Sequence, residues 1–154
     1  MSNPDWSVLI WIHEECLTPS SPALQAHPNA PRVFVFDENA NQQTSLKRLV
    51  FQYECLLEIP NIEIRKGDIV EQLTLAAQEY NCSRIVTTAA IAPDLQAICT
   101  QLQRDAKLTL TVLAPEPFVE LSAATAQQLD LKRFSRYWQA IKRQALTLNQ
   151  HFDW

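Results

Sequence analysis

Short apolar runs alternate with helix-like patterns along most of the chain, and this alternation constrains the fold more than any other feature. Four of the five runs lack regular polar alternation, as do strands that are buried on both faces of a sheet. The runs are rich in Val, Ile, Leu and Thr and cover residues 7–12, 32–36, 62–65, 84–88 and 108–113. We expect a strand at each of them.

Helical patterns lie between the later runs, and their apolar residues are expected to face a sheet. Asp68 with Glu71 resembles a capping box at one helix start, and Pro93 suits the first turn of another helix. Strands that alternate with helices predict an α/β, Rossmann-like, doubly wound parallel sheet with helices on both faces. The three sets of inward-facing residues are Leu46, Leu49, Val50, Tyr53 and Leu57; Val70, Leu73, Ala77 and Tyr80; and Leu95, Ile98, Cys99 and Leu102.

Length and composition narrow the class of protein. The 154 residues suit one domain, and no apolar run approaches the roughly 20 residues that a membrane span needs. The start of the chain lacks the basic and apolar pattern of a signal peptide, so we expect a cytoplasmic protein. The four cysteines and three histidines are scattered without metal-ligand spacing, which predicts reduced thiols and no metal site.

The carboxyl ends of the strands are the expected place for a ligand, because parallel sheets of this class bind ligands where the strand order reverses. Gly67 is the only glycine, so neither a dinucleotide fingerprint nor a Walker loop exists. His13 beside Glu14 is either an acid/base pair or a solvated rim, and we favour the rim. The candidate ligand-binding residues at strand ends are His13, Glu14, Asp37, Asp68, Thr87 and Thr88.

Five segments, taken in order, resemble the photolyase/cryptochrome family. They match the family's first strand and D-N-P-A-L loop, its second strand, its R-x-x-F-L-x-E-x-L helix, its G-D-P-x-E-x-L turn and its K-V-F-T-P-F-W segment. The segments are residues 11–24, 33–37, 47–56, 67–73 and 132–138. With the alternating elements, this resemblance implies the family's N-terminal α/β domain as a single domain over residues 1–154. Its core is expected at about 7–145, and its five-stranded sheet in the order 3-2-1-4-5.

The departures from the family pattern shape the functional prediction. His13 and Leu17 stand where the family has arginines, and residues 88–93 replace its N-R-E-Y-E-P stretch. The resemblance also leaves the family's FAD-binding helical domain without a counterpart, so we expect no enzyme activity, no light-driven DNA repair and no retained FAD. The favoured function is a non-catalytic interaction or regulatory module without a cofactor. The alternative is a small-ligand domain for a flavin, pterin or nucleotide, possibly as an antenna-type or accessory subunit of a photolyase-related system.

The C-terminal part predicts a basic amphipathic helix at about residues 130–149. Residues 130–150 carry five basic residues and one acid, whereas the whole chain has a net charge of −4, which argues against nucleic-acid binding. The apolar stripe of this helix either docks on the protein's own sheet or contacts a protein partner or a second copy. The residues predicted for such a contact are Arg133, Arg136, Tyr137 and Trp138, because Tyr, Trp and Arg are frequent interface anchors.

Overall fold

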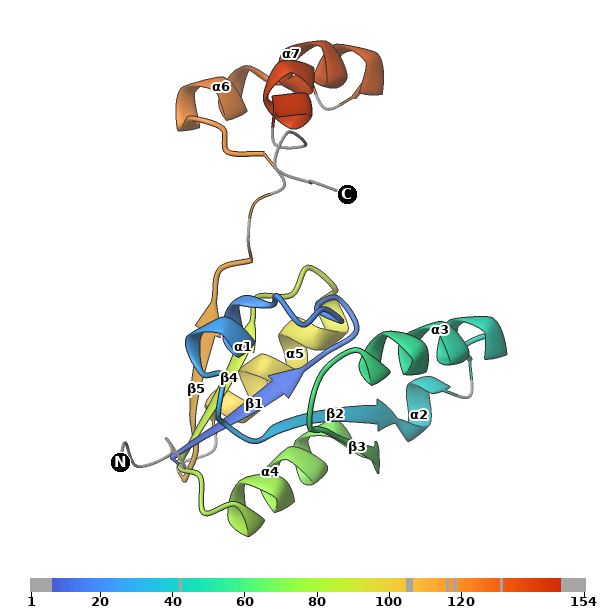
Figure 1. Ribbon diagram of the computed structural model, residues 1–154, viewed down its shortest axis with the longest axis vertical. Coiled ribbons are helices and arrows are strands. Elements are labelled where there is room, and N and C mark those ends of the chain that lie inside the picture. The colour runs from blue at the N-terminus through green and yellow to red at the C-terminus, as the bar shows by residue number, and fades with distance from the viewer. Residues whose placement is uncertain are drawn as a thin grey trace. The chain divides into compact units, whose positions relative to one another are not determined.

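The computed structural model describes residues 7–41, 43–104, 107–115, 117, 119–130 and 132–147 (Figure 1). Strands and helices alternate from β1 to β5, as the sequence predicts. The elements are β1 (Val8–Ile12), α1 (Pro22–Ala26), β2 (Arg32–Asp37), α2 (Glu38–Asn41), α3 (Leu46–Leu57), β3 (Ile62–Gly67), α4 (Ile69–Glu79), β4 (Arg84–Thr88), α5 (Pro93–Gln103), β5 (Thr109–Leu113), α6 (Ala123–Gln128) and α7 (Phe134–Thr147).

The five strands form one parallel sheet in the order β3-β2-β1-β4-β5, which confirms the predicted topology. All five residues of the central strand β1 are buried. β3 runs two residues past its predicted end, to Gly67, whose φ of +143° lies in a region that other residues rarely adopt. This glycine therefore lets the edge strand turn directly into α4.

Helices cover both faces of the sheet, so the fold has three layers (Figure 1). Leu9 and Trp11 of β1 pack with residues of α4 and α5 on one face. Ile10 and Ile12 pack with residues of α1 and α3 on the other face. The central strand thus supplies both cores by simple alternation of its side chains.

The starts of the helices that follow the sheet's carboxyl edge are capped from within the chain. The Asp68 side chain accepts a hydrogen bond from the backbone N–H of Glu71 at 2.9 Å, as the capping-box pattern predicts. Ser45 caps α3 in the same way. Pro93 occupies the first turn of α5, as predicted, and its N-cap residue Ala92 has no side-chain acceptor to offer. The start of α5 therefore needs an acceptor from elsewhere.

The orientation of α3 differs from the prediction. The stripe expected to face the sheet points mostly outward, with Leu46 75% and Leu57 65% exposed. Leu56 and Gln52 face inward instead, and the Gln52 side chain is satisfied by a hydrogen bond to Glu14. Because this amide has a partner, its burial is tolerated. The more regular apolar stripe is not covered by the described residues of the unit that contains the sheet.

A polar network joins β3 to the end of α4. Arg65 bonds Glu63 at 2.7 Å and also pairs with Glu79, while the Tyr80 hydroxyl donates to Glu63 at 2.6 Å. Burial by itself raises the pKa of Glu63, but the hydrogen bonds from Tyr80 and Arg65 outweigh it and hold that pKa below its usual value. The same bond raises the pKa of Tyr80. These contacts fasten the edge strand to the helix beside it.

The chain divides into two compact units, residues 1–115 with the sheet and residues 116–154. The sequence predicts the C-terminal helix at about residues 130–149, and the described helix α7 spans Phe134–Thr147. Leu129 is extended, and the Asp130 side chain accepts the backbone N–H of Lys132, so the chain turns before α7 begins at Phe134. The predicted positions 148 and 149 lie outside the described residues. A single domain with a core at about 7–145 stays a prediction.

The remaining predictions from composition concern membranes and thiols. Over the ranges that the structure describes, no helix combines the length and apolar character needed to cross a membrane. All four cysteines are free thiols. Cys16 and Cys82 are buried, whereas Cys55 and Cys99 are half-buried, and burial raises the pKa of the Cys99 thiol.

Candidate functional site

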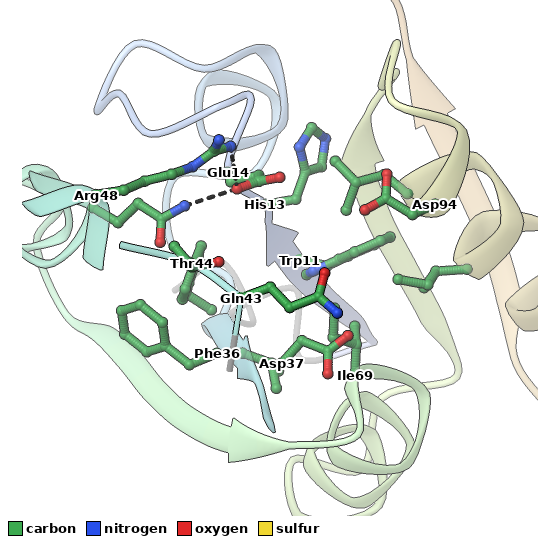
Figure 2. A pocket seen from close by; sticks show the side chains of 15 residues that line it. Trp11, His13, Glu14, Phe36, Asp37, Gln43, Thr44, Arg48, Ile69 and Asp94 are labelled. Atoms are coloured by element: carbon green, nitrogen blue, oxygen red, sulfur yellow. Dashed lines mark hydrogen bonds and ion pairs between the residues drawn. The ribbon is translucent and has the colours of Figure 1, made fainter. Parts of the chain in front are cut away.

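A pocket of about 290 Å³ lies at the carboxyl ends of β1 and β2 (Figure 2). Ligands bind at this edge in parallel sheets of this class, next to the point where the strand order reverses at β1. The lining comes from both strands, from the segment before α3, and from α3, α4 and α5. It consists of Trp11, His13, Glu14, Phe34, Val35, Phe36, Asp37, Gln43, Thr44, Arg48, Gln52, Ile69, Asp94, Leu95 and Ile98.

Glu14 and His13 have different partners, so they do not act on one another. The Glu14 carboxylate accepts hydrogen bonds from Arg48 Nη2 and Gln52 Nε2, both at 2.8 Å (Figure 2). His13 is buried, and its Nε2 lies 2.8 Å from the carbonyl oxygen of Thr88. Since a carbonyl only accepts, Nε2 carries the proton. Among the described residues no hydrogen bond joins His13 to Glu14, and this geometry gives no support to an acid/base pair.

Glu15 bonds the backbone that leads into α5. Its two carboxylate oxygens accept the backbone N–H groups of Ile91 at 2.6 Å and Ala92 at 2.8 Å. The Glu15 carboxylate therefore lies next to the N-terminus of α5, where the helix dipole favours a negative charge. This role was missed from the sequence, although an Ala at the N-cap before Pro93 is a signal that another group must cap the helix.

The structure separates the six predicted ligand-binding residues into two groups. His13, Glu14 and Asp37 line the pocket. Thr87 and Thr88 are buried: the Thr87 hydroxyl donates to the carbonyl oxygen of Trp11 at 2.8 Å, and the Thr88 hydroxyl accepts from Cys16 Sγ at 3.3 Å. Asp68 caps α4. These last three side chains hold the scaffold and are not part of the pocket lining.

The charged groups make the pocket acidic. Among the described residues of the lining, Arg48 is the only cation, and it forms an ion pair with Glu14 at 2.8 Å. Asp37 and Asp94 add two further carboxylates from the ends of β2 and the first turn of α5. Figure 2 shows Glu14 with Arg48 on one side of the pocket and Asp94 on the opposite side. Arg48 and Asp94 are not among the residues predicted from the sequence, because both lie in helices rather than at strand ends.

The residues predicted to contact a partner lie at the start of α7 in the second unit. Tyr137 and Trp138 are half-buried and pack with Val119 and Ile141 of that unit. Phe134 is 73% exposed, and its ring stacks on Trp138 with centroids 6.1 Å apart. Part of the predicted aromatic surface is therefore used inside the unit, and Phe134 is the aromatic residue left outside.

The two predicted arginines lie beside Phe134. Arg133 and Arg136 are both exposed, and Arg136 forms an ion pair with Asp130 at 2.7 Å. Exposed pairs of this kind contribute little to stability, so the guanidinium groups can exchange partners at small cost.

Comparisons with known proteins do not assign the chain to a family. No protein-family model matches the chain, and neither does any curated protein. Within the described residues, no group of three His, Cys, Asp or Glu side chains could hold a metal ion. Fold and site together define a doubly wound α/β protein with an acidic pocket at the carboxyl edge of its sheet. The photolyase/cryptochrome resemblance stays a prediction.

Proposed function

We propose that the chain is a non-catalytic binding module that holds a small planar heterocycle with N–H donors, such as a pterin or the ring system of a flavin. The observation that carries this proposal is the pocket at the carboxyl ends of β1 and β2. The sequence favours a module without a ligand, but the pocket gives more support to the small-ligand alternative.

The apolar part of the lining suits a flat ring. Trp11, Ile69, Leu95 and Ile98 converge on the pocket from one strand and two helices. The Trp11 and His13 rings meet edge to face with centroids 5.5 Å apart, which fixes the indole against the strand end. Ligand pockets typically combine such an apolar lining with a few placed polar groups, and about 290 Å³ favours a ligand near the small end of their range.

The polar part of the lining favours ligands with N–H donors and disfavours ligands with a phosphate group. Asp37 and Asp94 bring two carboxylates to the pocket, and Asp37 Oδ1 also accepts the backbone N–H of Asn39 at 2.8 Å. The charge of Arg48 is matched by Glu14. The Glu15 carboxylate lies beside the start of α5 and places a negative charge where a phosphate would otherwise be favoured. A neutral or cationic ring with N–H groups therefore fits better than the phosphates of a nucleotide, and the nucleotide version of this alternative loses support.

The way in which His13 and Glu14 are held supports the proposed lack of catalysis. His13 is fixed to a backbone carbonyl, and Glu14 is held by Arg48 and Gln52. General acid–base catalysis needs a group within hydrogen-bond reach of the substrate and able to exchange its proton. Both groups act here as braces between β1, β4 and α3, so we propose binding without transformation.

Calorimetric titration with pterin, riboflavin and FMN tests this proposal. We expect one-to-one binding of pterin or riboflavin, and an FMN affinity lower than that of riboflavin by about ten-fold or more, because the phosphate meets carboxylates at close range. Replacing Asp37 or Asp94 by Asn is expected to weaken binding of the preferred ring by about ten-fold, as expected for losing a hydrogen bond to a charged group.

Asp68→Asn is the matched control, since Asp68 also follows a strand but is not part of the pocket lining, and Asn retains the helix cap. Its affinity should equal that of the wild type. If neither ring binds at millimolar concentration, or if FMN binds more tightly than riboflavin, the proposed pocket chemistry is wrong.

A second candidate function is contact with an acidic protein partner through α7, and exposed Phe134 favours it. Changing Arg133 and Arg136 together to Glu is expected to reduce the amount of partner protein that the chain retains in a pull-down at low salt. Circular dichroism first confirms that the variant is folded. Changing Lys142 and Arg143 to Glu alters the charge equally on the same helix but away from Phe134, so recovery should stay near the wild-type value. Equal recovery with all three proteins would remove this candidate.

A further inference from the structure

The outward face of α3 carries a regular apolar stripe. Leu46, Val50, Tyr53 and Leu57 follow one another at intervals of four, three and four residues, which is the spacing of a coiled-coil seam. Leu46 and Leu57 are the most exposed of the four, and Val50 and Tyr53 are about half exposed. Soluble proteins rarely leave such a contiguous apolar surface without a use.

A shallow groove adjoins the stripe. Its volume is about 440 Å³, and it lies between α3 and the strands β2 and β3. Val50 and Tyr53 belong to both the stripe and the groove, and Phe36 and Ile64 continue the apolar surface toward the edge strand. The stripe therefore offers both projecting side chains and a recess that can accept side chains from a partner.

Charges along the stripe indicate what that partner is. Lys47 and Glu54 are exposed and lie on the same flank, each directly after a stripe residue. On the other flank, Leu49 and Leu56 turn toward the protein, with Leu56 fully buried. Lys47 and Glu54 are seven residues apart on this flank. On a second α3 that runs in the opposite direction, Glu54 lies opposite Lys47 and Lys47 lies opposite Glu54, so the charges are complementary.

We propose that α3 is a self-association surface, on which a second copy of this chain packs its own α3 antiparallel across a two-fold axis. In antiparallel helix pairs the equivalent flanks face each other, so Lys47 of each copy lies near Glu54 of the other. A parallel pair would place this charged flank against the Leu49 and Leu56 flank, which is turned toward the protein. Two-fold interfaces must be self-complementary, and this arrangement meets that condition in both shape and charge.

The association is expected to be weak. One helix of twelve residues on each side contributes less surface than the roughly 800 Å² per partner of a standard interface. The dimer should therefore dissociate on dilution in the micromolar range. Its flanking ion pairs are solvent-exposed, so higher salt should favour the monomer.

Sedimentation equilibrium of the full chain tests the surface directly. We expect the mass to rise from 17.6 kDa toward twice that value with concentration. Val50→Glu should hold the chain as a monomer throughout, because it places a charge within the seam. Phe51→Glu is the matched control, since Phe51 is 62% exposed on the same helix but outside the stripe. This control should dimerise like the wild type.

A charge-reversal cycle tests the antiparallel direction. Lys47→Glu or Glu54→Lys should each raise the dissociation constant by roughly four- to thirty-fold, because two symmetry-related ion pairs become like-charge contacts. The double variant K47E/E54K restores opposite charges across the axis, so its dissociation constant should return to near the wild-type value. Both residues are exposed, and these changes leave the core intact.

The outcomes distinguish a wrong surface from a wrong helix direction. A monomeric wild type at millimolar concentration, or a dimer that Val50→Glu leaves intact, overturns the surface. A dimer that is lost in Val50→Glu but not rescued in the double variant overturns the antiparallel arrangement. Ligand binding at the carboxyl edge is measured independently, so failure of either proposal leaves the other standing.

Discussion

Replacing Leu73 by Ala is expected to lower the free energy of unfolding by about 2–5 kcal/mol. Leu73 is fully buried in α4, where it packs in the core with Leu9 of the central strand and Ile85 of β4. Removing its methyl groups loses apolar burial and leaves a cavity that a well-packed core cannot fill. Urea denaturation followed by far-ultraviolet circular dichroism measures the loss.

Leu75→Ala on the same helix is the control. Leu75 is 39% exposed, so the same chemical change should cost less than about 1 kcal/mol. The difference between the two variants isolates burial from helix propensity, since both replace Leu by Ala within α4. Equal losses at the two positions would show that the inward face of α4 has been assigned wrongly.

The sheet could be predicted because its strands carry their own evidence. All five residues of β1 are apolar and buried, and a run like this fits only a strand covered on both faces. Leu73 and Ala77 of α4 likewise share a buried face, as their spacing predicts. Local pattern and final burial agree here because every side chain of β1 is apolar and buried, and the apolar face of α4 is the face that packs on the sheet.

For α3, apolar periodicity predicts the wrong face as the buried one. Its stripe from Leu46 to Leu57 is more regular than its buried face, which includes Gln52. The spacing of apolar residues identifies an apolar face of a helix, but it does not show whether the protein's own sheet or another surface covers that face. The burial of Gln52 depends on Glu14, a residue 38 positions earlier in the chain, and no local pattern reports that contact.

The pocket was only partly predictable for a related reason. His13, Glu14 and Asp37 follow strand ends, so the topology alone places them at the carboxyl edge. Asp94 and Arg48 reach the same pocket from helices whose orientation is set by packing. Glu15 directly follows the predicted residues His13 and Glu14. Its contact with the backbone before α5 can be expected only once Ala92 is recognised as an N-cap without a side-chain acceptor.

His13→Leu is expected to lower the free energy of unfolding by about 2–4 kcal/mol, although leucine is the more apolar residue. The imidazole is buried and bonds the Thr88 carbonyl oxygen at 2.8 Å through Nε2, while Nδ1 accepts the backbone N–H of Glu15 at 3.3 Å. Leucine leaves both backbone groups without their partner, and a buried unsatisfied group costs about 1–3 kcal/mol. Urea denaturation at pH 7 measures the change.

His13→Gln distinguishes the hydrogen bond from the shape of the ring. The glutamine amide places a donor near the position of Nε2, so it can bond the Thr88 carbonyl oxygen but leaves the N–H of Glu15 unpaired. We expect this variant to recover about 1 kcal/mol relative to His13→Leu, the typical net contribution of one hydrogen bond. Because the 2.8 Å bond joins the end of β1 to the end of β4, the same recovery should be seen in affinity for the preferred ring. If Gln and Leu lose equal stability, packing of the imidazole holds the strand ends together and the bond to Thr88 contributes nothing measurable.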